Sequence, residues 1–241
     1  MSLKNVNGWM VSDYDKMITK KLGSVDKNGD AIYEKKFRDT LIKNVKQKKV
    51  FVDVGANIGL WTRPMALAFE KVIAIEPAER NLTALRYNVA GMNNIELIEK
   101  GVGDEMIENA QFHNTIKNCG GIKLAEVSTR KSKQLKDTDF TADIITIDSL
   151  QLEECDLIKI DVEGYELKVL KGAEETLKKH KPWIFVEKND DEEVGVSHQK
   201  VHDFVMSLGI YDINDTDTRN AIYYPKTKTV IGNRRDLSNF I

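Results

Sequence analysis

The chain has 241 residues, and its 36 Lys and Arg residues nearly balance its 38 Asp and Glu residues, for a formal net charge of −2 at pH 7. This length fits one α/β domain with a small appendage, and the near-neutral charge argues against a surface for nucleic acid or an anionic membrane. No apolar segment approaches membrane-spanning length and the first residues form no secretory apolar core, so a cytoplasmic location is the expectation.

The first segment, residues 1–47, is predicted to form a helical cap. Apolar residues recur every four positions from Tyr33 to Val45, which predicts an amphipathic helix from Ala31 to Lys46. This cap could close over an active site, because little else in the chain is left to cover one. The main domain is expected over residues 48–226, followed by a tail of unknown role over residues 227–241.

A glycine turn follows the first strong strand signal. The apolar, β-branched run from Val50 to Val54 is typical of a strand buried on both faces. Asp53 lies near its end, and Gly55, Asn57 and Gly59 come directly after it. Glycines lack Cβ, so the backbone there can take strained angles and let a ligand approach closely. The turn therefore predicts a binding site at this strand end.

The next elements complete half of a nucleotide-binding unit. A helix predicted for residues 60–69 would direct its free N–H groups at the ligand. A second buried strand, from Lys71 to Ile75, ends in Glu76 and Pro77. Glu76 follows Asp53 by 23 residues, about where an acid must stand to accept hydrogen bonds from both ribose hydroxyls. The order strand, glycine turn, helix, strand and acid predicts a βαβ nucleotide site.

The middle of the chain is less readable. Helical spacing predicts a helix from Glu79 to Ala90, and a third short strand is expected from Ile95 to Ile98. Asp104 follows in a turn, where it could reach an adenine amino group or simply cap the turn. In the polar insertion that comes next, Phe112 and Leu124 are expected in the two strands of a hairpin.

A second strong signal surrounds Asp161. The apolar run from Leu157 to Ile160 predicts a buried strand whose carboxyl end presents Asp161, where open parallel sheets place ligands. Glu163 and Glu166 follow at the start of a predicted helix, and helix-start electrostatics alone accounts for them. The next strand ends in Glu187.

The C-terminal part of the main domain predicts the closure of a sheet. A helix is expected from Ser197 to Leu208, and two strands, Ile210 to Ile213 and Ala221 to Tyr224, read as an antiparallel hairpin. Repeated strand–helix units argue for an α/β fold with a doubly wound, Rossmann-like sheet of mostly parallel strands. The hairpin would close this sheet.

Two enzyme classes need a glycine turn and a ribose acid: dehydrogenases that use NAD, and methyltransferases that use S-adenosylmethionine. A dehydrogenase usually has a tighter glycine motif, with the pyrophosphate on the helix start. A carboxylate at Asp53 would repel a pyrophosphate but attract an aminoacyl ammonium, so the charge favours S-adenosylmethionine. A Rossmann-like binding protein without catalysis is a third reading, and the presence of Asp53, Glu76 and Asp161 counts against it.

Three blocks of the sequence resemble the FkbM-type methyltransferases: the segment from Asp53 to Gly59, the pair Glu76-Pro77, and the segment from Ile158 to Glu166 with the Leu170–Ala173 block that follows. The resemblance implies a class I methyltransferase fold and S-adenosylmethionine as donor. It also implies transfer to a hydroxyl oxygen of a sugar or another small molecule. The near-neutral charge argues separately against nucleic acid as a partner.

The expected chemistry is alignment of an acceptor oxygen with the methyl group, together with removal of a proton. Asp161 is the first candidate for the general base and Glu187 is the second. A variant reading has Asp161, Glu187 and Asn189 hold a Mg²⁺ ion that clamps two acceptor oxygens. The cofactor contacts are expected from Asp53, Gly55, Asn57, Gly59, Glu76, Pro77, Asp104 and Asp161.

Overall fold

The computed structural model describes residues 2–13, 15–115, 118–125, 139–191, 195–215 and 217–226, without the side chains of residues 114–115 and 118–120. The predicted tail, residues 227–241, lies outside the described part. None of the described helices is both long enough and apolar enough to cross a bilayer.

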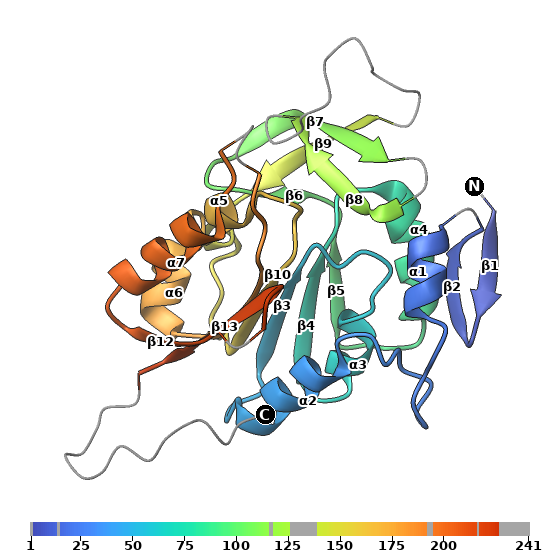
Figure 1. Ribbon diagram of the computed structural model, residues 1–241, viewed down its shortest axis with the longest axis horizontal. Helices are drawn as coiled ribbons and strands as arrows, with labels where there is room; N and C mark the ends of the chain where they lie inside the picture. Colours follow the sequence, from blue (N-terminus) through green and yellow to red (C-terminus); the bar gives the residue numbers. More distant parts are fainter. Residues whose placement is uncertain are drawn as a thin grey trace.

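A seven-stranded sheet forms the centre of the molecule, with strand order β12-β13-β11-β10-β3-β4-β5 (Figure 1). The five strands from β11 to β5 run parallel, whereas β13 runs antiparallel to β11 and pairs with β12. The predicted fold class and closing hairpin are confirmed. The strands are β3 (Val50–Val54), β4 (Lys71–Ile75), β5 (Ile95–Ile98), β10 (Leu157–Ile160), β11 (Trp183–Glu187), β12 (Tyr211–Asn214) and β13 (Asn220–Pro225).

Helices cover both faces of this sheet, because its central strands are apolar on both sides. On one face α5, α6 and α7 contribute a cluster that includes Leu170, Leu177 and Val205. On the other face, residues of α2 and α3 pack on Phe51 and Phe185, and α4 packs nearby. The helices are α2 (Lys35–Asn44), α3 (Thr62–Ala66), α4 (Glu79–Asn88), α5 (Glu166–Lys171), α6 (Glu174–His180) and α7 (His198–Ser207).

The chain crosses from one side of β3 to the other after β5. The strands β4 and β5 lie on one side of β3, and the later strands β10 and β11 lie on the other. Ligands of open parallel sheets bind outside the carboxyl ends of the strands at such a switch point. The residues that follow β3, β4, β10 and β11 therefore meet at one edge.

Two predicted helices differ in the structure. The first is only five residues long, Thr62–Ala66, because residues 57–60 form turns and Pro64 supplies no N–H for a longer helical ladder. The helix predicted after Asp161 starts at Glu166 and is split into α5 and α6 around Gly172, where a Cβ would lie 1.9 Å from the carbonyl oxygen of Gly103.

The N-terminal segment differs from the helical cap that the sequence predicts, because only part of it is helical. It begins with an antiparallel hairpin of β1 (Leu3–Val6) and β2 (Trp9–Ser12), followed by the short helix α1 (Lys16–Lys21) and by α2. The strands pack their buried residues, Trp9 and Val11, against Ala84 of α4 and the turn after β3. Within this segment, the helical periodicity of the sequence correctly predicts α2.

A second, four-stranded sheet lies over the carboxyl ends of the main sheet (Figure 1). Phe112 and Leu124 pair across its hairpin, as the sequence predicts, and α1 packs against β8. The N-terminal segment and this smaller sheet thus meet above the same edge. The strands are β6 (Gly101–Val102), β7 (Ile107–Thr115), β8 (Asn118–Leu124) and β9 (Phe140–Ile145), and the 3₁₀ helix η3 (Asp148–Leu150) follows.

Candidate functional site

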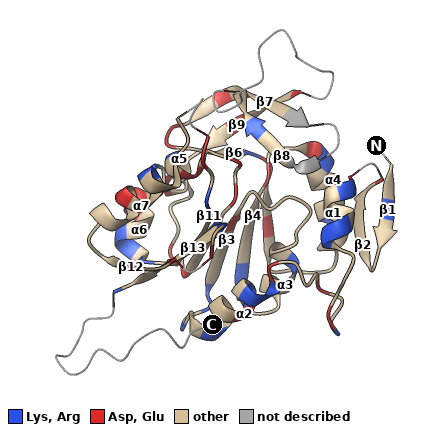
Figure 2. Ribbon diagram, viewed as in Figure 1, with Lys and Arg blue, Asp and Glu red and all other residues tan. Residues whose placement is uncertain are grey.

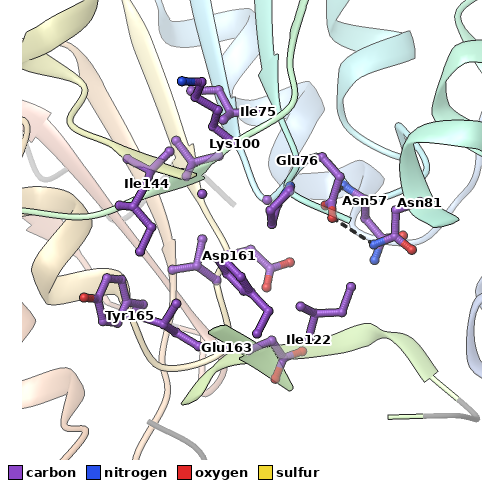
Figure 3. A pocket seen from close by; sticks show the side chains of 18 of the residues that line it. Asn57, Ile75, Glu76, Asn81, Lys100, Ile122, Ile144, Asp161, Glu163 and Tyr165 are labelled. Atoms are coloured by element: carbon purple, nitrogen blue, oxygen red, sulfur yellow. Dashed lines mark hydrogen bonds between the residues drawn. The ribbon is translucent and has the colours of Figure 1, made fainter. Parts of the chain in front are cut away.

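A cleft opens at the carboxyl edge of the main sheet, beneath the smaller sheet. Its empty space, including the open mouth, is about 810 Å³. In Figure 3, Asn57, Glu76 and Asn81 lie together on one side, and Glu163 and Tyr165 lie on the other. The predicted residues that line the cleft are Gly55, Asn57, Glu76, Pro77, Asp161 and Glu187.

Gly55 joins the two halves of the cleft. Its φ is +76°, and a Cβ at this position would lie 1.9 Å from the carbonyl oxygen of Asp161. The end of β3 can therefore pass directly against the end of β10 only because residue 55 has no side chain. This close approach places the glycine turn beside the segment that carries Asp161.

Glu76 organises the other end of the turn. Its carboxylate accepts hydrogen bonds from the backbone N–H groups of Asn57 and Ala78, at 2.9 and 3.0 Å, and from the side chain of Asn81 at 3.1 Å. Burial raises the pKa of Glu76, and these three donors oppose the rise. Because Glu76 also lines the cleft, it can bind a ligand while it fixes the turn.

Asn57 lines the cleft and carries an unsatisfied hydrogen-bond acceptor. It adopts a left-handed backbone conformation, with a φ of 54°. Its side-chain oxygen is buried and has no hydrogen-bond partner among the described residues. A buried acceptor without a donor is costly, by about 1–3 kcal/mol, so this atom suits a donor group on a ligand.

Asp53 does not line the cleft, which corrects the expected charge argument. Its side chain is fully buried and accepts a hydrogen bond from the hydroxyl of Thr62 at 2.6 Å. The ammonium of Lys159 lies 3.3 Å from its other oxygen. The negative charge of Asp53 is therefore compensated within the protein by Lys159. The two residues are in register on neighbouring strands and share one face of the sheet.

Gly59 and Asp104 also lie outside the set that lines the cleft. Gly59 has a φ of +94°, and a Cβ there would lie 2.8 Å from the Leu85 side chain, so its role is the packing of α4. The Asp104 carboxylate lies 3.1 Å from the ammonium of Lys168 on α5. Of the two readings for Asp104, this ion pair favours the structural one.

Three carboxylates gather at the far end of the cleft. Ligand atoms of Asp161, Glu163 and Glu187 all lie within 4.8 Å of one another, and all three residues are partly buried. Burial and the charge of Asp161 raise the pKa of Glu163 to about 7. Burial raises the pKa of Glu187 above its usual range, and Asp161 and Glu163 raise it further, so that Glu187 holds a proton at neutral pH.

The sequence did not single out Glu163 as a site residue. It lies in a loop with a φ of 56°, because α5 begins only at Glu166. Glu166 holds that loop: its carboxylate accepts the N–H groups of Val162 and Gly164, at 3.2 and 3.0 Å. The signal that could have found Glu163 is its position three residues after the buried strand β10, close to Asp161, which directly follows that strand.

The Mg²⁺ reading gains no support from the contacts. The amide nitrogen of Asn189 donates to Glu166 and to Glu187, each at 3.0 Å, so this side chain serves the acid cluster itself. The ammonium of Lys159 lies 3.7 Å from the Asp161 carboxylate and already supplies this acid with a positive charge.

The N-terminal segment contributes to the walls of the acid end. Lys21 of α1 lines the cleft, and its ammonium lies 4.1 Å from the centre of the Tyr33 ring. Burial raises the pKa of Tyr33, and the negative charges of Glu34, Asp161 and Glu187 raise it further. The smaller sheet supplies apolar walls, with Phe112, Ile122, Leu124 and Ile144.

Basic residues are spread over several helices and strands rather than gathered on one element (Figure 2). The cleft itself combines acids with an apolar roof, so the described part of the chain presents no concentrated basic stripe beside it.

Comparisons with known proteins agree with this architecture. A family model described as the methyltransferase FkbM domain matches residues 53–210. The methyltransferase sdnD of Sordaria araneosa is 29% identical over 177 residues, which cover 60% of this chain and 68% of that protein.

One solved structure supports the fold. The crystal structure of the methyltransferase FkbM from Methylobacillus flagellatus KT matches with a TM-score of 0.52 and 22% identity, over 74% of this chain and 44% of that chain. An rRNA methylase from Streptococcus thermophilus matches with a TM-score of 0.49 and 13% identity, over 81% of this chain and 96% of that one. Because the family model covers more than half of the 241 residues, the chain belongs to the FkbM family of methyltransferases.

Proposed function

We propose that this methyltransferase uses S-adenosylmethionine to methylate a hydroxyl oxygen of a sugar or another small molecule. The observation that carries the proposal is the division of one cleft into two ends. The glycine turn and Glu76 lie at one end, and the cluster of Asp161, Glu163 and Glu187 lies at the other.

The residues of the first end fit the donor. The carboxylate of Glu76 can accept hydrogen bonds from ribose hydroxyls, and the orphaned oxygen of Asn57 can accept another donor of the same ligand. Gly55 leaves room for the ligand beside the turn, and Pro77 gives an apolar wall. When bound there, S-adenosylmethionine supplies a methyl group that its sulfonium already activates for transfer.

The residues of the second end can take up the proton. The acceptor oxygen forms its bond to the methyl carbon while the carbon–sulfur bond breaks, and the hydroxyl proton passes to the carboxylate of Asp161. Glu187 holds its own proton and shares a hydrogen bond with Asp161, so it orients the base rather than competing with it. Alignment of two bound reactants contributes about 7–11 kcal/mol, and a general base adds a factor of roughly 10²–10⁴.

The family assignment decides against the dehydrogenase reading, although the charge of Asp53 no longer supports that decision. A binding protein without catalysis would not need three carboxylates at the acceptor end. Burying acids side by side costs free energy, and such clusters of perturbed groups mark functional sites. A small-molecule acceptor fits the acid-lined cleft.

Two variants test this proposal. Asp161→Asn removes the base while it preserves the shape of the side chain, and Asp212→Asn alters an exposed acid on β12 as a control. Formation of S-adenosylhomocysteine is measured with a panel of sugars and small alcohols, and donor binding is measured by calorimetry. We expect Asp161→Asn to lower kcat/KM by roughly 10²–10⁴ with donor binding little changed. Wild-type turnover in Asp161→Asn would remove the base assignment.

A further inference from the structure

We infer that Lys159 is a positioning residue of the methyl-transfer step: its buried ammonium ties the glycine turn to Asp161 and keeps the Asp161 carboxylate charged and open to the acceptor. This inference rests on the proposed function, because it assigns a partner to the proposed base. Lys159 lies within the Ile158–Glu166 block, but the sequence alone gives it no role.

Lys159 lies inside the protein, where a lysine needs strong partners. It is the third residue of β10 and is 3% exposed. A buried, unpaired ammonium costs several kcal/mol, so its contacts decide whether it can stay charged. Burial alone would lower the pKa of Lys159, but the charges of Asp53 and Asp161 raise it to about 12, and the side chain therefore remains an ammonium.

This ammonium donates two hydrogen bonds to the turn and forms an ion pair with Asp53. Its Nζ lies 2.7 Å from the carbonyl oxygen of Gly55, 3.2 Å from that of Val54 and 3.3 Å from the carboxylate of Asp53. These contacts bind β10 to the end of β3. Lys159 thus holds the strand that carries Asp161 at a set distance from the turn that faces the donor.

The contact with Asp161 is of a different kind. The distance from Nζ to the Asp161 carboxylate is 3.7 Å, which is an ion pair but too long for a good hydrogen bond. Asp161 keeps 35% of its side chain exposed. Lys159 can therefore favour the charged form of Asp161 without occupying the oxygen that would receive the acceptor proton.

Lys159 offsets a surplus of negative charge around Asp161. The other charged or titratable groups that interact with Asp161, or with Lys159 beside it, come from β3, the loop after β10, α5, β11 and the segment before α2. They are Asp53, Glu163, Glu166, Glu187, Glu34 and Tyr33. The cations Lys21 and Lys123 act on Glu163. Without Lys159, the neighbouring acids would favour a protonated Asp161.

The decisive measurement is the pH profile of kcat/KM. Lys159→Met removes the charge, and the double variant Asp53→Asn with Lys159→Met also removes the acid that would otherwise be left buried and unpaired. Lys159→Arg retains the charge. Lys71→Met serves as a control, because Lys71 is a strand residue paired with an acid, Glu96, at 2.7 Å but lies at the opposite end of its strand.

We expect both variants that lack the charge to move the acid limb of the profile upward by about 1–3 pH units. Lys159→Arg should restore the wild-type limb, and Lys71→Met should retain it. Calorimetry should find S-adenosylmethionine bound to the folded double variant. A folded double variant with the wild-type acid limb would overturn the inference, whatever its overall activity. Failure of the wild-type protein to bind S-adenosylmethionine would instead overturn the proposed function.

Discussion

At the scale of single residues, the acid cluster obtains different properties from similar groups. Asp161 has an ammonium at 3.7 Å, whereas Glu187 faces two other carboxylates and the side-chain amide of Asn189. Two neighbouring carboxyl groups in such different surroundings can divide the roles of base and proton holder. The chemistry of the cleft depends on this division.

Glu187 makes stability depend on pH. Its pKa is higher in the folded protein than in the unfolded chain, so its protonated form is favoured on folding. This contribution is fully present below the unfolded value of about 4.3 and is lost as the pH rises through the folded value. We expect Glu187→Gln, which cannot ionise, to be more stable than the wild type at pH 8 by about 1 kcal/mol or more.

Urea unfolding at pH 5 and pH 8 measures this effect. The gain from Glu187→Gln should be larger at pH 8 than at pH 5. Glu108→Gln, which changes an exposed acid on β7, should give no such difference. An equal effect of Glu187→Gln at both pH values would show that Glu187 is ionised throughout.

Alanine substitutions at Gly55 and Gly91 distinguish the cost of backbone strain from the cost of a steric clash. Both have positive φ angles, +76° and +84°, but a Cβ at Gly55 would meet the Asp161 carbonyl at 1.9 Å, whereas at Gly91 it would meet nothing within 4 Å. Gly91→Ala should cost about 1–2 kcal/mol. Gly55→Ala should cost more and should also weaken donor binding, because β3 and β10 must move apart. Equal losses of unfolding free energy would contradict the close approach.

The residues show where sequence reasoning succeeds and where it stops. Strand ends could be located, so Glu76, Asp161 and Glu187 were found. The position of Asp53 inside the protein depends on the pairing of β3 with β10, which puts Lys159 opposite it. Glu163 was assigned to a helix start, and only the late start of α5 places it in the cleft. The spacing of residues within one segment does not predict contacts between segments that are far apart in the sequence.

At the scale of elements, the side chain of Asp148 in η3 caps the start of α6, which lies far from it in sequence. Asp148 accepts hydrogen bonds from the backbone N–H groups of Glu175 and Thr176, at 3.1 and 2.8 Å, and from the Thr176 hydroxyl at 2.7 Å. These are free N–H groups of the first turn of α6, which its own preceding residue, Ala173, leaves without a side-chain cap.

Removal of this cap should be measurable. We expect Asp148→Ala to lower the free energy of unfolding by about 0.5–2 kcal/mol, in the range of N-cap losses. Glu153→Ala, an exposed acid a few residues further along, should change it by less than about 0.5 kcal/mol. Chemical denaturation of both variants compares them directly, and equal effects would rule out Asp148 as a cap.

The elements differ in how far the sequence determines them. The buried strands β3, β4, β5 and β10 follow from continuous apolar runs, because a parallel sheet covered on both faces demands them. The hairpin of β1 and β2 has no such run; its burial depends on α4, which lies far away in sequence. A mixed pattern of this kind cannot be read before the packing partner is known.

At the scale of the whole molecule, three separate parts of the chain enclose one cleft. The main sheet supplies the floor of the cleft, and the smaller sheet supplies its apolar roof. The N-terminal segment contributes Lys21 to its wall. The family match begins at residue 53, so most of the N-terminal segment lies before it. We expect the acceptor preference to reside in that segment and in the smaller sheet, since binding specificity is commonly carried outside the shared scaffold.

Calorimetric titration with S-adenosylmethionine tests the central claim, that the glycine turn and Glu76 form its site, most directly. The wild-type protein should bind one equivalent. Glu76→Gln should bind roughly 10–100-fold more weakly, as loss of a hydrogen bond to a charged group implies. Glu79→Gln, which alters an exposed acid paired with Arg86, should bind as the wild type does. No binding by the wild type, or equal binding by Glu76→Gln, would contradict the account.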